Sequence, residues 1–510
     1  MLVAVLTFAA CLLVFTCIGA LAVRQRTKTT DDYLVASRNV SPWLTALSAV
    51  ATNNSGFMFV GLIGFAYRFG TEAVWLQAGW IVGDVIAWLW VHQRVRKVSG
   101  DLRVASVPAL LATQGDGRVQ LGVRGATGLL TLIFLGGYAA AQLKAGSTTL
   151  YALFGWEPWI GVVIGAVIVI VYCFSGGLRA SIWTDAAQAI VMLVSMAVLL
   201  GYAMHHAGSP ATLMRGLAEQ DPTLVEWIPS GLAWGFGVYC LGFVAGGFGA
   251  VGQPHILIRT MAISSAGGIP RARRVYLVWF VLFSASAVLV GLYARVLLPE
   301  LLTETAVQGL ADPAEHALPR LGLELLPSVL VGLLLAGIFS ATMSTADSQI
   351  LSCSAAVTQD IVPRWSQSYR ASKLATLGVT SFALFVALSA GEGVFQLVLS
   401  AWSALGATLG PLLLLRVFGH YVPTSWALVM MGAGLTTVFA WEHGPWADDV
   451  FKLLPGFVAP FAFYAVFRGV TGLARRRSPP AVGQTTGRQM SAAERARPAP
   501  PDPERAAGGP

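Results

Sequence analysis

The chain has 510 residues, of which 55% are hydrophobic and 11% are charged, and its formal net charge at pH 7 is +8. Soluble domains carry about 25% charged residues, so this composition excludes an ordinary soluble protein and indicates an all-α polytopic membrane protein. Basic residues that flank membrane helices lie at anionic headgroups of the lipid bilayer, so the positive charge reflects membrane topology and no nucleic-acid partner is expected.

Apolar stretches long enough to cross a bilayer recur along the whole chain. A membrane-spanning helix needs about 20 mostly apolar residues, and by this measure we expect about thirteen spans. They lie near residues 1–23, 42–70, 73–95, 124–150, 157–176, 182–204, 230–252, 275–298, 326–358, 374–391, 394–418, 425–441 and 450–470.

Basic residues collect in every second linker between these spans. They include Arg24, Arg26, Arg94, Arg96, Arg179, Arg259, Arg271, Arg364, Arg416 and Arg475. The positive-inside rule places such linkers in the cytoplasm. We therefore expect a multi-pass protein of the cell (inner) membrane, with its N-terminus outside and its C-terminus in the cytoplasm.

The second span is interrupted near its middle by Asn53, Asn54, Ser55 and Gly56, which are poor helix formers. Unwound backbone at membrane depth is tolerated where it is buried in protein or lines a cavity, and its free carbonyls can then bind a cation. The alternative is a simple kink packed against a neighbouring helix. We favour a binding site, because both asparagine side chains also need partners.

Polar residues also occur in the fourth and sixth spans. Tyr138 and Gln142 lie one helical turn apart in the fourth span, where they face either a substrate cavity or neighbouring helices. Asp185 enters the membrane in the sixth span. A carboxylate there is either the partner of a nearby arginine or a way-station for a cation, and the sequence leaves both readings open.

The seventh span is a second broken helix, with five glycines and a proline between Gly242 and His255. It lies about five spans after the first broken helix, so the two occupy corresponding positions in two halves of opposite topology. Paired interruptions of this kind indicate an inverted-repeat transporter with a substrate site near the midplane of the membrane.

The ninth span carries a polar stripe. In a helix, Ala341, Ser344, Thr345, Ser348 and Ser352 fall on one face at spacings of three and four. The simpler interpretation is that these small residues permit close helix packing and that each hydroxyl bonds a carbonyl one turn earlier. The functional interpretation is that they bind an ion.

Three separated segments resemble the sodium:solute symporter family: Gly176–Gln188, Gly252–Arg259 and Met343–Gln349. The resemblance extends from about Asp32 to Val470 and implies a LeuT-type core of five plus five inverted-repeat helices. We accordingly expect a first helix and linker at 1–40, a transport core at 41–418 with repeats at about 41–204 and 230–418, two further helices at 419–474, and a disordered cytoplasmic tail at 475–510.

The resemblance also implies a Na+ site. Its expected ligands are the backbone carbonyls of Ala51, Asn54 and Ala341 and the hydroxyls of Ser344 and Thr345. A hard cation takes several oxygen ligands, and a broken helix supplies unpaired carbonyls. A possible ion path comprises Asn53, Asp185, Asp347 and Ser348. Family members that carry proline have an aspartate important for sodium at the position of Asn53, so we expect weaker ion attraction or altered coupling here.

For the solute, the resemblance implies a pocket formed by Ser55, Gly56, Phe57, Tyr138, Gln142, Gly246, Ala250 and Pro254. Gly246 and Ala250 stand where proline-carrying members have a tryptophan and a tyrosine, and Phe57 stands where they have another tryptophan. The loss of two aromatic side chains from the glycine-rich helix predicts a larger pocket and a bulkier or different solute.

Together these observations predict a secondary active transporter that couples Na+ to uptake of a small-molecule solute, such as proline or a related amino acid, by alternating access. We expect no organic cofactor and no obligatory protein partner. A proton-coupled or uncoupled transporter of the same fold is the nearest alternative, prompted by Asn53. A transporter-like sensor and a membrane enzyme follow, although the tail is short and no nucleophile–base constellation stands out.

Overall fold

The computed structural model describes residues 2–24, 27, 29–302, 313–389, 394–447 and 449–477. These residues are helical almost throughout, and their only β-type pairings are two isolated bridges, Val40 with Ile263 and Thr113 with Val119. The chain divides into two units, Met1–Ala465 and Val466–Pro510. The described part of the second unit is the end of the last helix. The predicted all-α class is confirmed.

The α-helices have the following bounds. They are α1 Leu2–Val23, α2 Thr30–Val35, α3 Pro42–Asn53, α4 Gly56–Phe59, α5 Gly61–Phe69, α6 Ala73–Trp90, α7 His92–Asp101, α8 Val107–Ala112, α9 Leu121–Leu130, α10 Gly136–Phe154, α11 Pro158–Ala207, α12 Pro210–Gln220, α13 Gly235–Phe248, α14 Pro254–Ala262, α15 Ile269–Leu297, α16 Ala317–Leu325, α17 Ser328–Ala355, α18 Tyr369–Ser389, α19 Val394–Val417, α20 Thr424–Glu442 and α21 Leu453–Arg477. Two π-helical turns, Thr131–Leu135 and Ala356–Ile361, precede α10 and follow α17.

Eleven helical stretches in the described residues are long and apolar enough to cross a membrane. One of them, 56–101, covers the expected span 73–95 and the later part of the expected span 42–70. Another pair of expected spans is continuous in α11, whose only non-helical residue is Gly177, with φ 58°. The structure thus supports a multi-pass membrane protein, and the figure of about thirteen spans stays a prediction.

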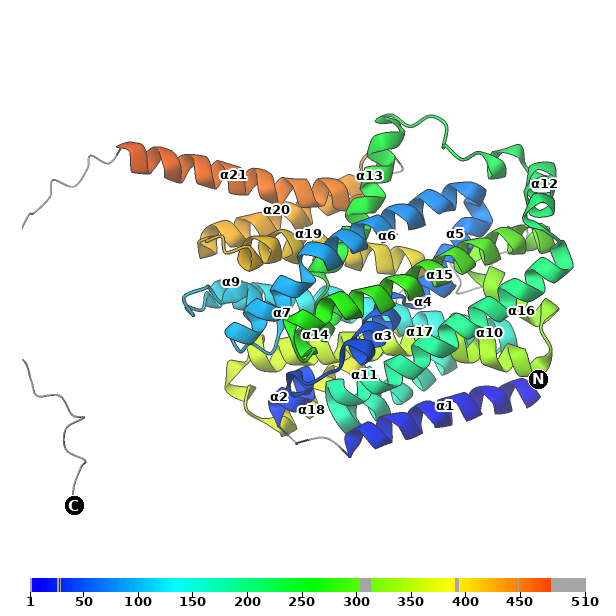
Figure 1. Ribbon diagram of the computed structural model, residues 1–510, viewed down its shortest axis with the longest axis horizontal. Helices are drawn as coiled ribbons and strands as arrows, with labels where there is room; N and C mark the ends of the chain where they lie inside the picture. Colours follow the sequence, from blue (N-terminus) through cyan, green and yellow to red (C-terminus); the bar gives the residue numbers. More distant parts are fainter. Residues whose placement is uncertain are drawn as a thin grey trace, which may run out of the picture. The chain divides into compact units, whose positions relative to one another are not determined.

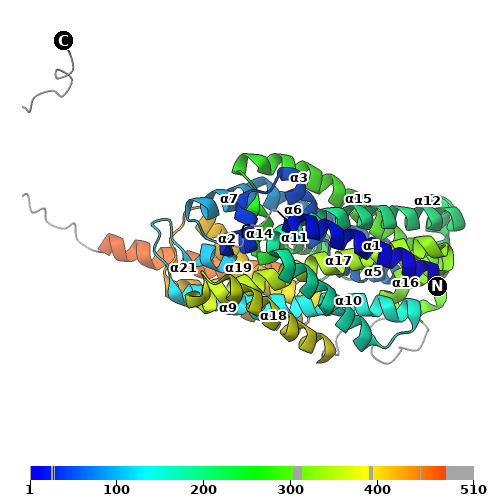
Figure 2. The same ribbon diagram turned by 90° about the horizontal axis from the view of Figure 1, so that it is seen from below.

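Helix α17 lies at the centre of the first unit. It packs against α1, α3, α10, α11, α14 and α18, and Figures 1 and 2 show it running through the bundle with α10 and α11 beside it. Every residue from Leu334 to Ala355 is buried. A helix covered on all sides has no lipid-facing surface, so its polar side chains must find partners within the protein.

Both predicted helix breaks are present. Helix α3 begins at Pro42, with Ser41 as its N-cap, and ends at Asn53. Asn54 leaves the helical conformation, and the Ser55 hydroxyl then caps α4 by accepting a hydrogen bond from the Phe57 amide, 3.2 Å away. Helix α13 is separated from α14 by a 3-10 turn and the extended residue Gln253. Asparagine, serine and glycine favour such interruptions because they bond or relax the backbone locally.

Helices α6 and α13 touch backbone to backbone at glycines. A Cβ atom on Gly83 would lie 2.0 Å from the carbonyl oxygen of Val244, and a Cβ on Gly247 would lie 1.9 Å from the carbonyl oxygen of Trp80. No side-chain rotation relieves an overlap with backbone. The α6–α13 contact therefore depends on these two glycines.

We expect Gly83→Ala to destabilise the protein by about 1–3 kcal/mol, because the added methyl group pushes α6 away from α13. The measurement is the apparent unfolding temperature of the purified protein in detergent. Gly378→Ala on α18 is the matched control, because nothing lies within 4 Å of its added Cβ. Equal unfolding temperatures for Gly83→Ala and Gly378→Ala would contradict the close contact.

The turn at Gly177 inside α11 packs against α2, in the segment that follows α1. A Cβ on Gly177 would lie 2.5 Å from the Tyr33 ring, so the positive φ and the close approach both require glycine. Arg179 donates to Asp32 at 2.6 Å and to the Ala36 carbonyl at 2.9 Å. Burial acts to raise the pKa of Asp32, but hydrogen bonds from Arg179, the Thr27 amide and Ser37 outweigh it and hold that pKa below its ordinary value.

Candidate functional site

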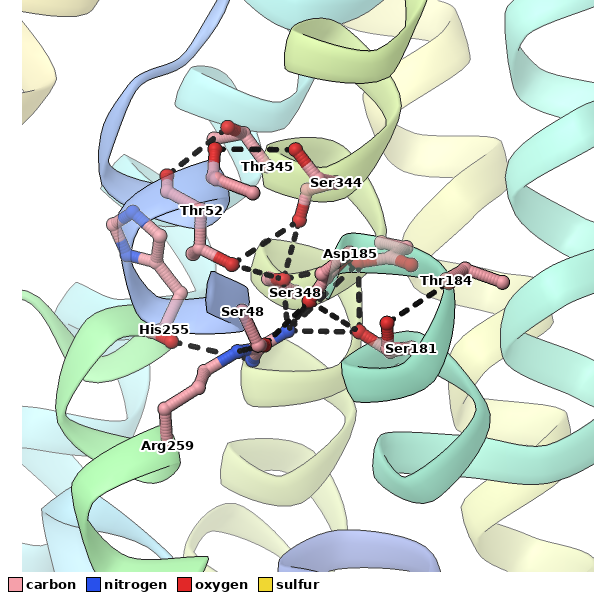
Figure 3. A network of polar contacts seen from close by, with 12 residues as sticks. Ser48, Thr52, Ser181, Thr184, Asp185, His255, Arg259, Ser344, Thr345 and Ser348 are labelled. Carbon is pink, nitrogen blue, oxygen red and sulfur yellow. Dashed lines mark hydrogen bonds and ion pairs between the residues drawn. The ribbon is translucent and has the colours of Figure 1, made fainter. Parts of the chain in front are cut away.

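The hydroxyls of Ser344 and Thr345 extend from α17 to the broken end of α3. The Ser344 hydroxyl lies 3.1 Å from the carbonyl oxygen of Ala51, and the Thr345 hydroxyl donates to the carbonyl of Thr52 at 3.0 Å. All four residues are fully buried. Figure 3 shows Ser344, Thr345 and Thr52 grouped between the two helices.

These α3 carbonyls are available because the helix stops. In a continuous helix, the carbonyls of Ala51 and Thr52 would accept amide hydrogen bonds from residues four positions later. The helix ends at Asn53, so their oxygens instead face the α17 hydroxyls. With the Ala341 carbonyl, 3.2 Å from the Ser344 hydroxyl, five oxygens gather at the break. Uncharged oxygens of this kind suit a hard monovalent cation.

The structure brings together four of the five predicted Na+ ligands: Ala51, Ala341, Ser344 and Thr345. The fifth predicted ligand is the backbone carbonyl of Asn54, a residue that lies at the break itself, and the Asn54 side-chain amide donates to the Val50 carbonyl at 2.8 Å. The oxygen that contacts Thr345 belongs to Thr52, which the sequence analysis did not single out. The role of the whole set as ligands stays a proposal.

Within the polar stripe, the simpler interpretation is sufficient for Ser352, and it also describes the neighbouring Ser340. Ser340, Ser348 and Ser352 each donate to the carbonyl four residues earlier, at 2.6, 2.5 and 2.8 Å. Such bonds satisfy a hydroxyl within its own helix and require no ligand. Ser344, Thr345 and Ser348 differ because their hydroxyls also contact other helices: Ser344 and Thr345 contact carbonyls of α3, and Ser348 contacts the Thr52 hydroxyl and Arg259.

Next to this group lies a buried ionic network centred on Arg259 of α14. The Arg259 side chain is fully buried and forms ion pairs with Asp185, at 3.2 Å, and with Asp347, at 3.9 Å. It also donates to the hydroxyls of Ser181 and Ser48, at 2.8 and 3.2 Å, and to that of Ser348. Figure 3 shows Arg259 extending from α14 into the space between α3, α11 and α17.

The network corrects the sequence-based interpretation of Arg259. Its place in the sequence predicts a basic residue of a cytoplasmic linker, whereas Arg259 is a fully buried counter-charge. Of the two roles left open for Asp185, the structure shows the pairing with an arginine, and Asp185 also accepts from Ser48 at 2.6 Å; a role in the ion path stays a prediction. Two carboxylates share a single guanidinium here, so with both carboxylates ionised the network has one negative charge that is not balanced. An unbalanced buried charge costs free energy.

The network and the hydroxyl group are connected. The Thr52 hydroxyl is 3.1 Å from the hydroxyl of Ser348, and Ser348 in turn is bonded to Asp347 at 2.9 Å. The predicted ion-path residues Asp185, Asp347 and Ser348 therefore form one continuous set that begins beside the α3 break. Asn53, the fourth of them, points elsewhere and donates to the hydroxyl of Tyr276 on α15 at 2.5 Å.

A small cavity lies on the other side of the break. Its walls come from α3, α4, α6, α10, α15 and α19, and they comprise Asn53, Asn54, Ser55, Phe57, Met58, Gln77, Trp80, Tyr138, Phe280, Val398, Leu399 and Trp402. Three predicted solute residues, Ser55, Phe57 and Tyr138, line it, and the hydroxyls of Ser55 and Tyr138 are 3.2 Å apart. Gln142 lies behind the wall, where its side-chain oxygen accepts from the Gly56 amide at 2.8 Å.

Gly246, Ala250 and Pro254 do not line this cavity. A Cβ on Gly246 would meet the Trp80 ring at 2.8 Å and the Phe451 ring at 3.2 Å. Trp402 also donates to the Gly246 carbonyl at 2.8 Å. The space expected to open beside Gly246 is thus filled by aromatic rings from other helices, and the predicted enlargement does not occur at that position.

The sequence analysis missed several residues of this region, including Gln77, Trp80, Asp84, Tyr276 and Trp402. One signal was available for Asp84, which is the only acidic residue in the apolar stretch from Ala73 to Trp90. An ionisable residue within a membrane span indicates a functional site by default. The aromatic residues carried no such signal, because aromatic side chains are common in apolar helices.

The fold and the site define a class of protein. Two broken helices meet a buried polar helix, which is the arrangement of secondary transporters built from inverted repeats. A solved Na+-coupled sialic acid symporter matches 92% of this chain and 98% of its own, with a TM-score of 0.72 at 19% identity. MHP1, a nucleobase-cation-symport-1 family transporter, matches 86% of this chain and 95% of its own, with a TM-score of 0.53 at 15% identity. The fold is therefore of the LeuT type, as predicted.

Sequence comparison gives the family. The sequence model of the sodium:solute symporter family matches residues 33–434. The high-affinity proline transporter PutP of Bacillus subtilis is 30% identical over 451 residues, which are 85% of this chain and 91% of that protein. The sodium/proline symporter of Escherichia coli is 29% identical, over 86% and 88% of the two chains. The chain belongs to the sodium:solute symporter family, and it is a sodium-coupled solute transporter of the membrane and not an enzyme.

Proposed function

We propose that this protein takes up a small organic solute, with an amino acid such as proline as the first candidate, and that Na+ binds between α3 and α17. The observation that carries the ion site is the contact of Ser344 and Thr345 with the carbonyls of Ala51 and Thr52. The proline-carrying relatives support the choice of solute. We place the solute in the cavity that Ser55, Phe57 and Tyr138 line.

The two sites share one element, which gives the coupling a physical basis. Asn54 and Ser55 form the break between α3 and α4, and both line the solute cavity. The last carbonyls of α3 belong to the ion site on the α17 side. An ion that holds these carbonyls fixes the conformation of the break, so the solute binds to a wall that is already in place.

In this proposal the protein alternates between states open to the outside and to the cytoplasm. In it, the basic linkers orient the chain with its N-terminus outside, and the core at 41–418 carries both sites. Residues 1–40 precede this core in the sequence, and 419–474 and the tail at 475–510 follow it. Asp185, Asp347 and Ser348, which are joined by a hydrogen bond and through Arg259, form the candidate ion path. The membrane potential favours entry of the cation by about 2.3 kcal/mol per elementary charge per 100 mV.

The test is uptake of labelled proline into proteoliposomes with an inward gradient of NaCl or of choline chloride. We expect uptake to fall at least about tenfold when choline replaces sodium. Choline is too large to be coordinated by the five closely spaced oxygens of the proposed site. A panel of other amino acids, a sugar and sialic acid, each added as a competitor, then identifies the solute. Uptake that is equal in sodium and choline would refute sodium coupling and favour the proton-coupled alternative.

A further inference from the structure

A buried carboxyl group outside the Arg259 network lies on α6. Asp84 is 1% exposed, and its Oδ2 accepts a hydrogen bond of 2.5 Å from the hydroxyl of Tyr276 on α15. Its Oδ1 has no hydrogen-bond partner. No lysine, arginine or histidine of the described residues forms an ion pair with Asp84. Burying an ionised carboxylate without a cation costs free energy, so in the protein without solute a proton or another cation must neutralise Asp84.

The helices around Asp84 offer few other titratable groups. From α15 the Tyr276 hydroxyl faces it, and from α3 the uncharged amide of Asn53 is in reach of the same hydroxyl. Helix α13 approaches α6 through backbone, at the glycine contact described above. Two turns further along the chain is His92, whose ring stacks on Trp88 at 4.3 Å. These surroundings supply too few oxygens for a metal cation, whereas a proton needs only the carboxylate itself.

Asp84 is linked to the solute cavity by two hydrogen bonds. The Tyr276 hydroxyl donates to Asp84 and accepts from the Asn53 side-chain nitrogen, at 2.5 Å in each case. Asn53 lines the cavity, and its side-chain oxygen has no partner. This oxygen without a partner is an acceptor at the cavity wall, and the Asn53 side chain is separated from the Asp84 carboxyl by the Tyr276 hydroxyl alone.

The direction of this chain depends on the charge of Asp84. When the carboxyl is ionised, Tyr276 donates to it, Asn53 donates to Tyr276, and the Asn53 oxygen is left for the cavity. When the carboxyl is protonated it can donate to Tyr276 instead. The Asn53 amide, whose nitrogen now faces Tyr276, then turns over so that its oxygen accepts from the Tyr276 hydroxyl. A hydroxyl has one proton to give, so both arrangements cannot coexist. Ionised Asp84 thus presents an acceptor to the solute, and protonated Asp84 removes it.

We propose that Asp84 is a proton-binding residue that loses its proton when the positively charged nitrogen of the solute binds in the cavity. Tyr276 and Asn53 link the two events, because their hydrogen bonds reverse direction when Asp84 changes its charge. The solute is then a compound with a protonated amine or ammonium group, and its binding releases one proton from the Asp84 carboxyl to solvent. The inference rests on the proposed solute cavity but not on the identity of the coupling ion.

The first measurement requires no solute. The infrared spectrum of the purified protein, titrated with pH, should contain a band of a buried protonated carboxyl that is missing from Asp84→Asn. The matched control is Asp116→Asn, which alters an exposed carboxylate paired with Arg118. If the spectra of the wild type and Asp84→Asn are identical at every pH, Asp84 holds no exchangeable proton and the proposal is wrong.

The second measurement is calorimetry of L-proline binding in saturating NaCl, in two buffers of different ionisation enthalpy. We expect wild type to release close to one proton for each proline bound, with affinity falling about tenfold for each pH unit on the acid side. Asp84→Asn should release no proton on binding proline, and its affinity should not depend on pH in this way. Tyr276→Phe should bind proline more weakly but keep the infrared band of the protonated Asp84 carboxyl. Equal proton release by the wild type and Asp84→Asn would overturn the exchange. Sodium-dependent binding confined to sugars or sialic acid would overturn the cationic solute and leave sodium coupling intact.

Discussion

Ser344→Ala and Thr345→Ala should each raise the sodium concentration needed for half-maximal uptake by at least about tenfold, equivalent to about 1.4 kcal/mol of binding free energy. Each substitution removes one oxygen from the group between α3 and α17 and leaves an α3 carbonyl without its hydroxyl partner. The measurement is proline uptake by proteoliposomes over a range of NaCl concentrations. The maximal rate at saturating sodium should change less than the sodium dependence, because the solute cavity is untouched.

The same helix supplies the control. Ser340 is equally buried, and its hydroxyl donates to the Ala336 carbonyl within α17. Ser340→Ala should therefore leave the sodium dependence of uptake close to that of the wild type. If both site variants behaved like Ser340→Ala, the hydroxyls would serve only to join α17 to α3, and the ion site would lie elsewhere.

Arg259→Met should have the largest effect on stability. The substitution keeps a side chain of similar length but leaves Asp185 and Asp347 buried without a counter-charge. Removing one partner of a buried ion pair typically costs about 3–5 kcal/mol. We expect little folded protein after purification in detergent, or an apparent unfolding temperature well below that of the wild type, with Arg118→Met as the exposed control.

A compensating variant separates the loss of charge balance from the loss of packing. Arg259→Met combined with Asp185→Asn and Asp347→Asn removes all three charges together. If the charges account for the instability, the triple variant should recover most of the lost unfolding temperature. An unfolding temperature as low as that of Arg259→Met alone would show that the guanidinium matters through its hydrogen bonds to Ser48, Ser181 and Ser348.

The sequence predicted the helix breaks well because their cause is local. Asn54 and Ser55 interrupt the first broken helix, and Gln253 before Pro254 interrupts the second, through backbone preferences that hold in any environment. The stripe on α17 was likewise predictable, since helical periodicity places Ser344 and Thr345 on one face. Which of its hydroxyls contact another helix was not, because that depends on where α3 lies.

The errors concern contacts between helices that are distant in the sequence. Arg259 resembles a linker residue in the sequence, because an arginine at the end of an apolar stretch is common at a membrane surface. Its burial depends on acids of α11 and α17 that only the fold brings to it. The filled space beside Gly246 has the same origin, since Trp80 and Phe451 come from other parts of the chain.

The two hydroxyls at the α3 break also bear on how readily the ion leaves. In the proposed sodium site, the bound ion would take the place of the hydrogen bonds that join these hydroxyls to the α3 carbonyls. The Ser344 proton has an alternative acceptor 3.2 Å away, the Ala341 carbonyl, to which it can turn when its oxygen binds a cation. Ion binding would break both hydroxyl–carbonyl bonds, and release of the ion would restore them. The energy of these bonds is thus set against the energy of ion binding, which lowers the affinity of the proposed site and favours release of the ion.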